Sequence, residues 1–108
     1  MTTTVIELVT YKLKQGVDKS ALNDSHSKVN DFLKAQQGFL YRSLSEDKNG
    51  LLHDIVYWQD MSCAELAGKA FEQSAACAPL MSITDMESVT MQHMTAMTEA
   101  MSCQGEPA

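Results

Sequence analysis

Between residues 39 and 58 the chain reads FLYRSLSEDKNGLLHDIVYW, which is its clearest structural signal. Two runs rich in aromatic and aliphatic residues, 39–45 and 51–58, flank a polar segment, 46–50, that ends in Asn49-Gly50. Asn-Gly between two such runs strongly indicates a β-hairpin, because both residues tolerate the positive φ that tight turns require. We therefore expect two adjacent antiparallel strands in the middle of the chain.

A strand and a helix are predicted before the hairpin. Residues 5–13, VIELVTYKL, are rich in β-branched residues and are followed by Gln15-Gly16, as is typical of a strand and its end. Asp18 is then a good N-cap for a helix, in which Leu22, Val29 and later apolar residues recur at helical spacing. We expect this helix to end at Gly38, in the left-handed conformation that glycine favours.

A second helix and a last strand are predicted after the hairpin. Residues 62–65, Ser-Cys-Ala-Glu, match a capping box and predict the start of a helix. Pro79 interrupts the helical pattern, and residues 80–83 are expected to form a short extra turn. A strand is expected at 88–97, where Val89, Met91 and His93 alternate with Thr90, Gln92 and Met94.

The resulting order is β-α-β-β-α-β. With right-handed crossovers it predicts an α+β, ferredoxin-like split βαβ fold, with one antiparallel four-stranded sheet and both helices on one face. The 108 residues suffice for one domain. We assign residues 1–97 to that domain and residues 98–108 to a flexible C-terminal tail.

Charge and cysteine usage narrow the class of partner and the compartment. Fourteen acidic residues against eight Lys and Arg give a net charge of −6, which disfavours nucleic acid as a partner. The sequence has no basic amphipathic segment, no long apolar stretch and no signal-peptide pattern at its start, so neither a membrane nor secretion is expected. Cys63, Cys77 and Cys103 form no Cys-x-x-Cys pair, as is typical of thiols in a reducing cytoplasm.

The hairpin loop determines which side chains share a face. A loop of two or four residues gives two sets, and the set that is less rich in aliphatic residues near its centre is expected away from the helices. Glu7, Val9 and Tyr11 of the first strand are expected to join it. The hairpin members of this set are Tyr41, Ser43, Asp54, Val56 and Trp58. The other set, expected beneath the helices, is Leu40, Arg42, Leu44, His53, Ile55 and Tyr57, with Ile6 and Leu8. An odd loop would exchange the two hairpin faces.

The face away from the helices is then too apolar to remain in water, because Val9, Val56, Trp58 and two tyrosines would lie on it. We expect a second copy of the chain to cover it, giving a homodimer and a two-sheet barrel. The enclosed lumen would be apolar with a few polar groups, which suits a small hydrophobic or aromatic ligand. This expected lumen depends on Trp58 lying away from the helices.

Three segments carry a resemblance to a known family: 5–17 (VIELVTYKLKQGV), 38–40 (GFL) and 54–58 (DIVYW). Together they resemble the dimeric α/β-barrel superfamily, and within it most closely the antibiotic biosynthesis monooxygenase-like domains, over about residues 5–95. The resemblance implies the fold derived above. It constrains function less, because the superfamily includes oxygenases, isomerases, cyclases and haem enzymes.

For the site, the resemblance implies a pocket lined by Trp58, which matches a tryptophan at the end of the third strand in cofactor-free oxygenases of phenolic polycyclic compounds. By their facing, Glu7 and Asp54 are candidate proton acceptors beside Trp58 in a catalytic site. The candidate ligand-binding residues are Tyr11, Tyr41, Ser43, Val9 and Val56. Alternatively, Trp58 and the tyrosines form an interface core, and the carboxylates only pair across it.

No cofactor or metal is predicted. The haem-binding members of the resembling family need a histidine where Gly68 stands and an asparagine where Val9 stands. His26, His53 and His93 fall on three different elements without metal-ligand spacing. The methionines around residues 91–94 are better explained as adaptable packing than as a copper site.

Two functions remain open. One is cofactor-free oxidation or rearrangement of a small aromatic or polyketide-like compound, and the other is a non-catalytic dimeric barrel that binds a small hydrophobic ligand. An unpaired Glu7 or Asp54 favours catalysis, whereas an ion pair favours the second function. Imidazoles ordinarily titrate near pH 6.5 and can shuttle protons. We interpret His53 as an outer hairpin residue, and the facing of His93 is undetermined.

Overall fold

The computed structural model describes residues 3–100, and the β-α-β-β-α-β order is confirmed. The elements are β1 (Val5–Leu13), α1 (Lys19–Lys34), β2 (Phe39–Glu46), β3 (Leu52–Trp58), α2 (Met61–Gln73), α3 (Ala78–Ile83) and β4 (Thr84–Thr95). The short helix α3 is the extra turn expected after the break at Pro79, which lies in its first turn. Of the predicted tail, residues 101–108 lie outside the described residues.

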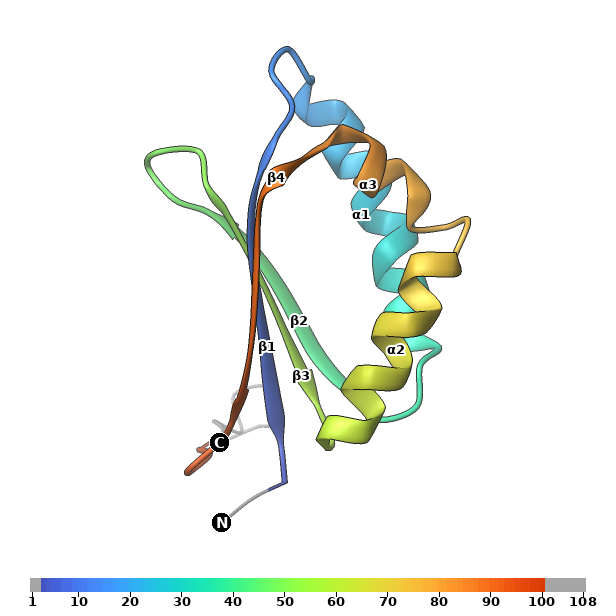
Figure 1. The fold of residues 1–108 in the computed structure, drawn as a ribbon, viewed down its shortest axis with the longest axis vertical. Helices are drawn as coiled ribbons and strands as arrows, with labels where there is room; N and C mark the ends of the chain where they lie inside the picture. The colour runs from blue at the N-terminus through green and yellow to red at the C-terminus, as the bar shows by residue number, and fades with distance from the viewer. Residues whose placement is uncertain (1–2, 101–108) are drawn as a thin grey trace, which may run out of the picture.

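The strands form one antiparallel sheet in the order β2-β3-β1-β4. Helices α1, α2 and α3 all lie on one side of it, and in the described part of the chain no helix covers the other side (Figure 1). We call that other side the outer face. The predicted ferredoxin-like fold class is confirmed.

Local capping is confirmed at one helix and shifted at the other. The Asp18 carboxylate accepts a hydrogen bond from the Ser20 amide at 3.0 Å, as an N-cap should. Helix α2 begins two residues earlier than the capping box implied, because the Asp60 carboxylate accepts from the Cys63 amide at 2.9 Å. Ser62 is therefore inside the helix, not its cap.

Two other boundaries differ from expectation. Helix α1 ends at Lys34, with Ala35 as its C-cap, whereas Gly38 lies beyond it in the turn to β2 with φ +80°. Strand β4 begins at Thr84, directly after α3, where the register pairs Thr84 with Leu13. The predicted start near residue 88 was too late. The register between β1 and β4 shifts between the pairs Thr10–Thr90 and Lys12–Asp85, so the first residues of β4 are separated by an irregularity from the alternating stretch that follows.

The hairpin loop is odd, and the predicted grouping of side chains from its two strands on one face is wrong. Glu46 pairs with Leu52, which leaves residues 47–51 in the loop. The Asp47 carboxylate accepts from the amides of Asn49 and Leu51 at 2.9 and 3.1 Å, and so holds a wider turn than Asn-Gly alone would make. Arg42 and Leu44 therefore share a face with Val56 and Asp54. Tyr41 and Ser43 lie on the outer face, across from Tyr57 and Ile55.

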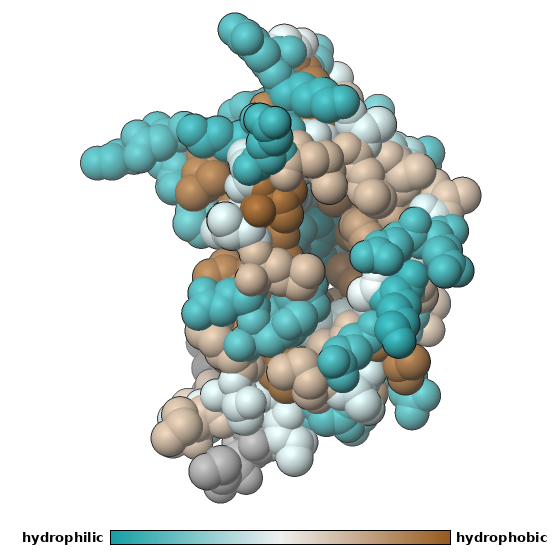
Figure 2. All heavy atoms as spheres, viewed as in Figure 1, coloured by the Kyte–Doolittle hydropathy of each residue, from teal (hydrophilic) through white to brown (hydrophobic). Residues whose placement is uncertain are grey.

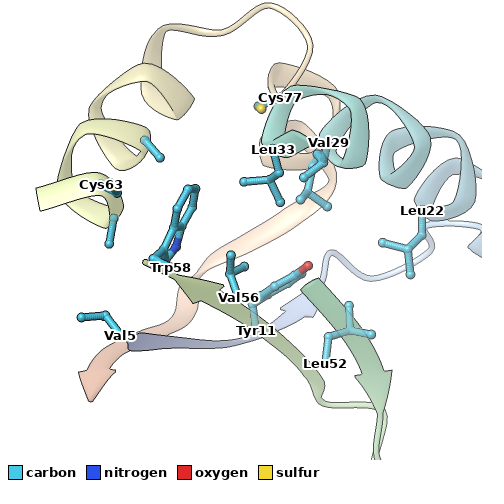
Figure 3. Packing of buried hydrophobic residues seen from close by; sticks show 13 residues of the cluster. Val5, Tyr11, Leu22, Val29, Leu33, Leu52, Val56, Trp58, Cys63 and Cys77 are labelled. Carbon is cyan, nitrogen blue, oxygen red and sulfur yellow. The ribbon is translucent and has the colours of Figure 1, made fainter. Parts of the chain in front are cut away.

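The Trp58 face is the one beneath the helices, opposite to expectation. Along β3, Leu52, Asp54, Val56 and Trp58 are buried, and the residues between them are half-buried. Figure 3 shows Trp58 pointing from the sheet toward the helices, with Val29 and Leu33 of α1 across the layer. Ile6 and Leu8 were expected beneath the helices. They pair with Tyr57 and Ile55, which alternate with the buried residues of β3, and so lie on the outer face.

Candidate functional site

A cavity of about 490 Å³ lies between the sheet and the helices of a single chain. The space-filling view shows a hollow between the sheet and the helix layer, with apolar side chains at its margin (Figure 2). Its apolar lining includes Val9, Val56, Trp58, Val29, Leu33, Ala64, Ala67, Phe71, Leu80, Met81, Met86, Val89 and Met91. This volume and this largely apolar lining are typical of small-molecule sites.

The predicted site residues separate into two groups. Six of them line this cavity together: Glu7, Val9, Tyr11, Asp54, Val56 and Trp58. Tyr41 and Ser43 lie on the outer face, and Tyr41 packs edge-on against Tyr57 with ring centroids 6.0 Å apart. The lumen expected away from the helices therefore does not form from these residues, because the β1 and β3 members of the set face the helices, whereas Tyr41 and Ser43 face away from them.

Arg42 and Asp54 form a buried, two-pronged ion pair on one wall of the cavity. Arg42 Nε and Nη2 donate to Asp54 Oδ1 and Oδ2 at 2.9 and 2.6 Å. Their side chains are 4% and 11% exposed. Arg42 Nη1 also donates to the Asn30 side chain at 2.8 Å, which connects the pair to α1. Fork-to-fork geometry of this kind makes the strong class of charge-assisted hydrogen bonds.

Tyr11 completes this network. Its hydroxyl donates to Asp54 Oδ2 at 3.2 Å, and the residue is almost fully buried. Burial, followed by the charge of Asp54, raises the pKa of Tyr11 well above its ordinary value. Tyr11 is therefore a neutral donor at physiological pH, and both oxygens of Asp54 are engaged.

Trp58 is the largest fully buried side chain and lies at the end of β3. Phe39 packs edge-on against it with ring centroids 5.8 Å apart. Its indole N–H has no acceptor among residues 3–100, although it is buried. A buried donor without a partner costs about 1–3 kcal/mol, and a ligand oxygen that reached it would recover part of that cost.

Glu7 and His93 form a second polar pair on the cavity wall. They face each other across β1 and β4, and His93 Nε2 lies 3.2 Å from Glu7 Oε1. The side chain of His93 is 28% exposed and that of Glu7 is 19% exposed, and both residues line the cavity. Sequence reasoning left His93 undetermined, although its parity with Val89 and Met91 was the signal that places it here.

The remaining histidines lie elsewhere. His53 contacts Asp47 at 3.1 Å beside the hairpin loop, on the outer face. His26 is on α1, its Nδ1 is buried without a partner in the described part of the chain, and burial lowers its pKa, with the nearby charge of Arg42 adding to the effect. No cluster of three or more His, Cys, Asp or Glu residues suited to a metal ion occurs between residues 3 and 100. In the same range, no helix is long and apolar enough to cross a membrane.

Comparisons with known proteins support the fold. No family profile and no curated protein matches the sequence. Among solved structures, SnoaB, a cofactor-independent oxygenase from Streptomyces nogalater, superposes with TM-score 0.71 at 13% identity, over 90% of this chain and 96% of its own. The monooxygenase from the gene ActVA-Orf6 of Streptomyces coelicolor, in complex with nanaomycin D, gives 0.69 at 14% identity, over 93% of each chain.

A dimeric ferredoxin-like protein of unknown function from Thermobifida fusca superposes with TM-score 0.71 at 7% identity, over 89% of this chain and 93% of its own. At these identities the likeness shows the fold. The expected resemblance in fold to the antibiotic biosynthesis monooxygenase-like, dimeric α/β-barrel proteins is confirmed.

Proposed function

We propose that the cavity binds a small aromatic, polyketide-like compound and that the chain catalyses its oxidation or rearrangement without a cofactor. The observation that carries the proposal is the apolar cavity that ends on Trp58 and has a carboxylate–imidazole pair, Glu7 and His93, on its wall. Two of the similar folds belong to oxygenases, one of them described as cofactor-independent, which supports the choice of reaction.

The two proposed carboxylates have different roles. Asp54 is saturated by Arg42 and Tyr11, so its role is to hold these two side chains in place on the cavity wall. Glu7 has His93 as its side-chain partner among the described residues, so it contributes to the cavity as one half of a carboxylate–imidazole pair. Trp58 offers a flat apolar surface for an aromatic ring and an unpaired donor.

Trp58 is the only tryptophan of the chain, so its fluorescence reports directly on the occupancy of the cavity. We expect 1-naphthol to quench this fluorescence in a saturable way. We also expect the protein, in chelator-treated buffer, to accelerate oxygen uptake with formation of 1,4-naphthoquinone and water. Here one C–H becomes C=O and the phenol O–H is lost, with dioxygen as the oxidant.

A matched pair of variants on α2 tests the location of binding. Ala67 lines the cavity and is buried, whereas the neighbouring Leu66 is 62% exposed. A larger side chain in Ala67→Leu occupies cavity space and is expected to weaken quenching at least tenfold, while Leu66→Met leaves it unchanged. Equal quenching in both variants would place the ligand elsewhere.

The alternative function, binding without catalysis, is favoured by the pairing of both candidate bases, Asp54 with Arg42 and Glu7 with His93. It predicts saturable quenching of Trp58 without any protein-dependent oxygen uptake. The same two measurements therefore separate the two functions.

We further propose that the chain is a homodimer that buries the outer face. Apolar and aromatic residues gather there at adjacent register positions: Ile6, Leu8, Ile55, Tyr57, Tyr41 and Met94. They are exposed or only half-buried in one chain, and Tyr41 is 58% exposed. One similar fold is described as dimeric. The proposed dimer interface is therefore made of these residues and not of the face that carries Trp58.

We also propose a cytoplasmic location. Cys63 and Cys77 are buried free thiols, as is usual in a reducing compartment. The acidic net charge continues to disfavour nucleic acid as a partner.

A further inference from the structure

The geometry points to His93, not a carboxylate, as the group that takes the proton from the hydroxyl of a phenolic ligand, with Glu7 as the residue that positions it. The inference rests on the proposed function, because it concerns the same cavity. It names the accepting atom, His93 Nδ1, and the chemical class of the ligand, an aromatic compound with an acidic hydroxyl.

The pairing with Glu7 leaves one ring nitrogen available. Glu7 Oε1 lies 3.2 Å from His93 Nε2, and an ionised carboxylate can only accept, so Nε2 carries the hydrogen. In a neutral imidazole the other nitrogen, Nδ1, then has a free lone pair. The two residues are register partners on neighbouring strands, so the backbone of the sheet holds this arrangement in place.

The two carboxylates on the sheet side of the cavity, Asp54 and Glu7, are poor proton acceptors. Asp54 receives two hydrogen bonds from Arg42 and one from Tyr11, and taking a proton would break the ion pair. The Glu7 carboxylate already accepts the hydrogen bond from His93 Nε2. Across the cavity, α2 contributes three further charged groups to the lining, namely Glu65, Lys69 and Glu72.

The step is a simple proton transfer. The O–H bond of the ligand breaks, its electron pair stays on the oxygen, and a new N–H bond forms at His93 Nδ1. The products are a phenolate and an imidazolium, and Glu7 stabilises the imidazolium because it bears the opposite charge at hydrogen-bond distance. A phenolate is the electron-rich form of the ligand, and it is the form from which electrons pass most readily to dioxygen.

The test measures the ionisation of a bound probe, not turnover. The probe is 4-nitrophenol, whose phenolate absorbs at longer wavelength than the phenol, titrated with pH in the presence of saturating intact protein. Quenching of Trp58 measures its binding independently. We expect the bound probe to contain at least tenfold more phenolate at a given pH with the unmodified protein than with His93→Gln, whose amide cannot accept a proton.

The chain supplies a matched control in His53, which makes the same kind of contact with Asp47 but lies on the outer face. His53→Gln is expected to leave the ionisation of the probe unchanged. Glu7→Gln is a second variant, which keeps the side-chain size but removes the negative charge. It is expected to lower the bound phenolate several-fold, an effect that loss of packing alone would not produce.

Each outcome decides one question. If the probe binds and ionises equally in the unmodified protein and in His93→Gln, His93 is not the acceptor, although the cavity still binds phenols. If 4-nitrophenol quenches Trp58 in neither protein, the proposed function fails and the inference fails with it. A fall in phenolate for His53→Gln as large as that for His93→Gln also overturns the assignment.

Discussion

At the scale of single residues, the Arg42–Asp54 pair is the most consequential contact in the molecule. Arg42→Ala leaves the Asp54 carboxylate buried without its counter-charge, and we expect it to reduce the free energy of unfolding by about 3–5 kcal/mol. Lys19→Ala removes an exposed ion pair with Glu46 and is expected to cost less than about 1 kcal/mol. Urea unfolding measures both, and similar losses would contradict the burial of the pair.

The raised pKa of Tyr11 predicts that the free energy of unfolding falls at alkaline pH. Burial raises its pKa in the folded chain above the ordinary value of about 10 that it has when unfolded. Below about pH 10 both states keep the proton and the stabilisation is complete; above it, the unfolded chain releases its proton first, so the free energy of unfolding falls. Urea unfolding at about pH 8 and about pH 11 should show this fall, and Tyr11→Phe should reduce it.

At the scale of elements, the turn between α1 and β2 depends on Gly38. Its φ of +80° disfavours any side chain, and a Cβ built there overlaps the thiol of Cys63 on α2. Gly16 has a similar φ of +84° with open space around it, so Gly16→Ala measures the conformational cost alone, about 1–2 kcal/mol. We expect Gly38→Ala to cost about 1–3 kcal/mol more, measured by thermal or urea unfolding.

The elements could be predicted from the sequence because their signals are local. The strand at 5–13, the cap at Asp18 and the break at Pro79 each follow from the preferences of a few neighbouring residues. The start of α2 was placed two residues late because Asp60 and Ser62 are both good caps. Only the geometry of the chain leaving β3 decides between them.

The facing of the sheet could not be predicted in the same way. Asn49-Gly50 suggested a tight even loop, but Asp47 collects the amides of Asn49 and Leu51 and makes the loop odd. One residue more or fewer in the loop reverses the facing of one hairpin strand relative to the other, so Arg42, not Tyr41 or Ser43, shares a face with Asp54 and Val56. The set of Asp54, Val56 and Trp58 was still recognised as belonging together, because alternation along one strand does not depend on the loop.

At the scale of the whole molecule, the correction of the facing separates the cavity from the proposed dimer interface. The lining residues all come from the helix side of one chain, whereas Ile55 and its neighbours lie on the outer face. We therefore expect the unmodified protein to have twice the mass of one chain in light scattering. Ile55→Lys, which places a charge in the centre of the outer face, should reduce the mass to that of one chain.

Leu66→Lys, on the exposed side of α2, is the control and should leave the dimer intact. The monomeric Ile55→Lys protein should still show quenching of Trp58 by 1-naphthol, because the residues that line the cavity belong to one chain. Loss of quenching together with loss of the dimer would mean that the second chain shapes the cavity after all. Persistence of the dimer in Ile55→Lys would instead place the interface away from the outer face. Assembly and ligand binding are thus expected to be separable by single substitutions on opposite faces of the same sheet.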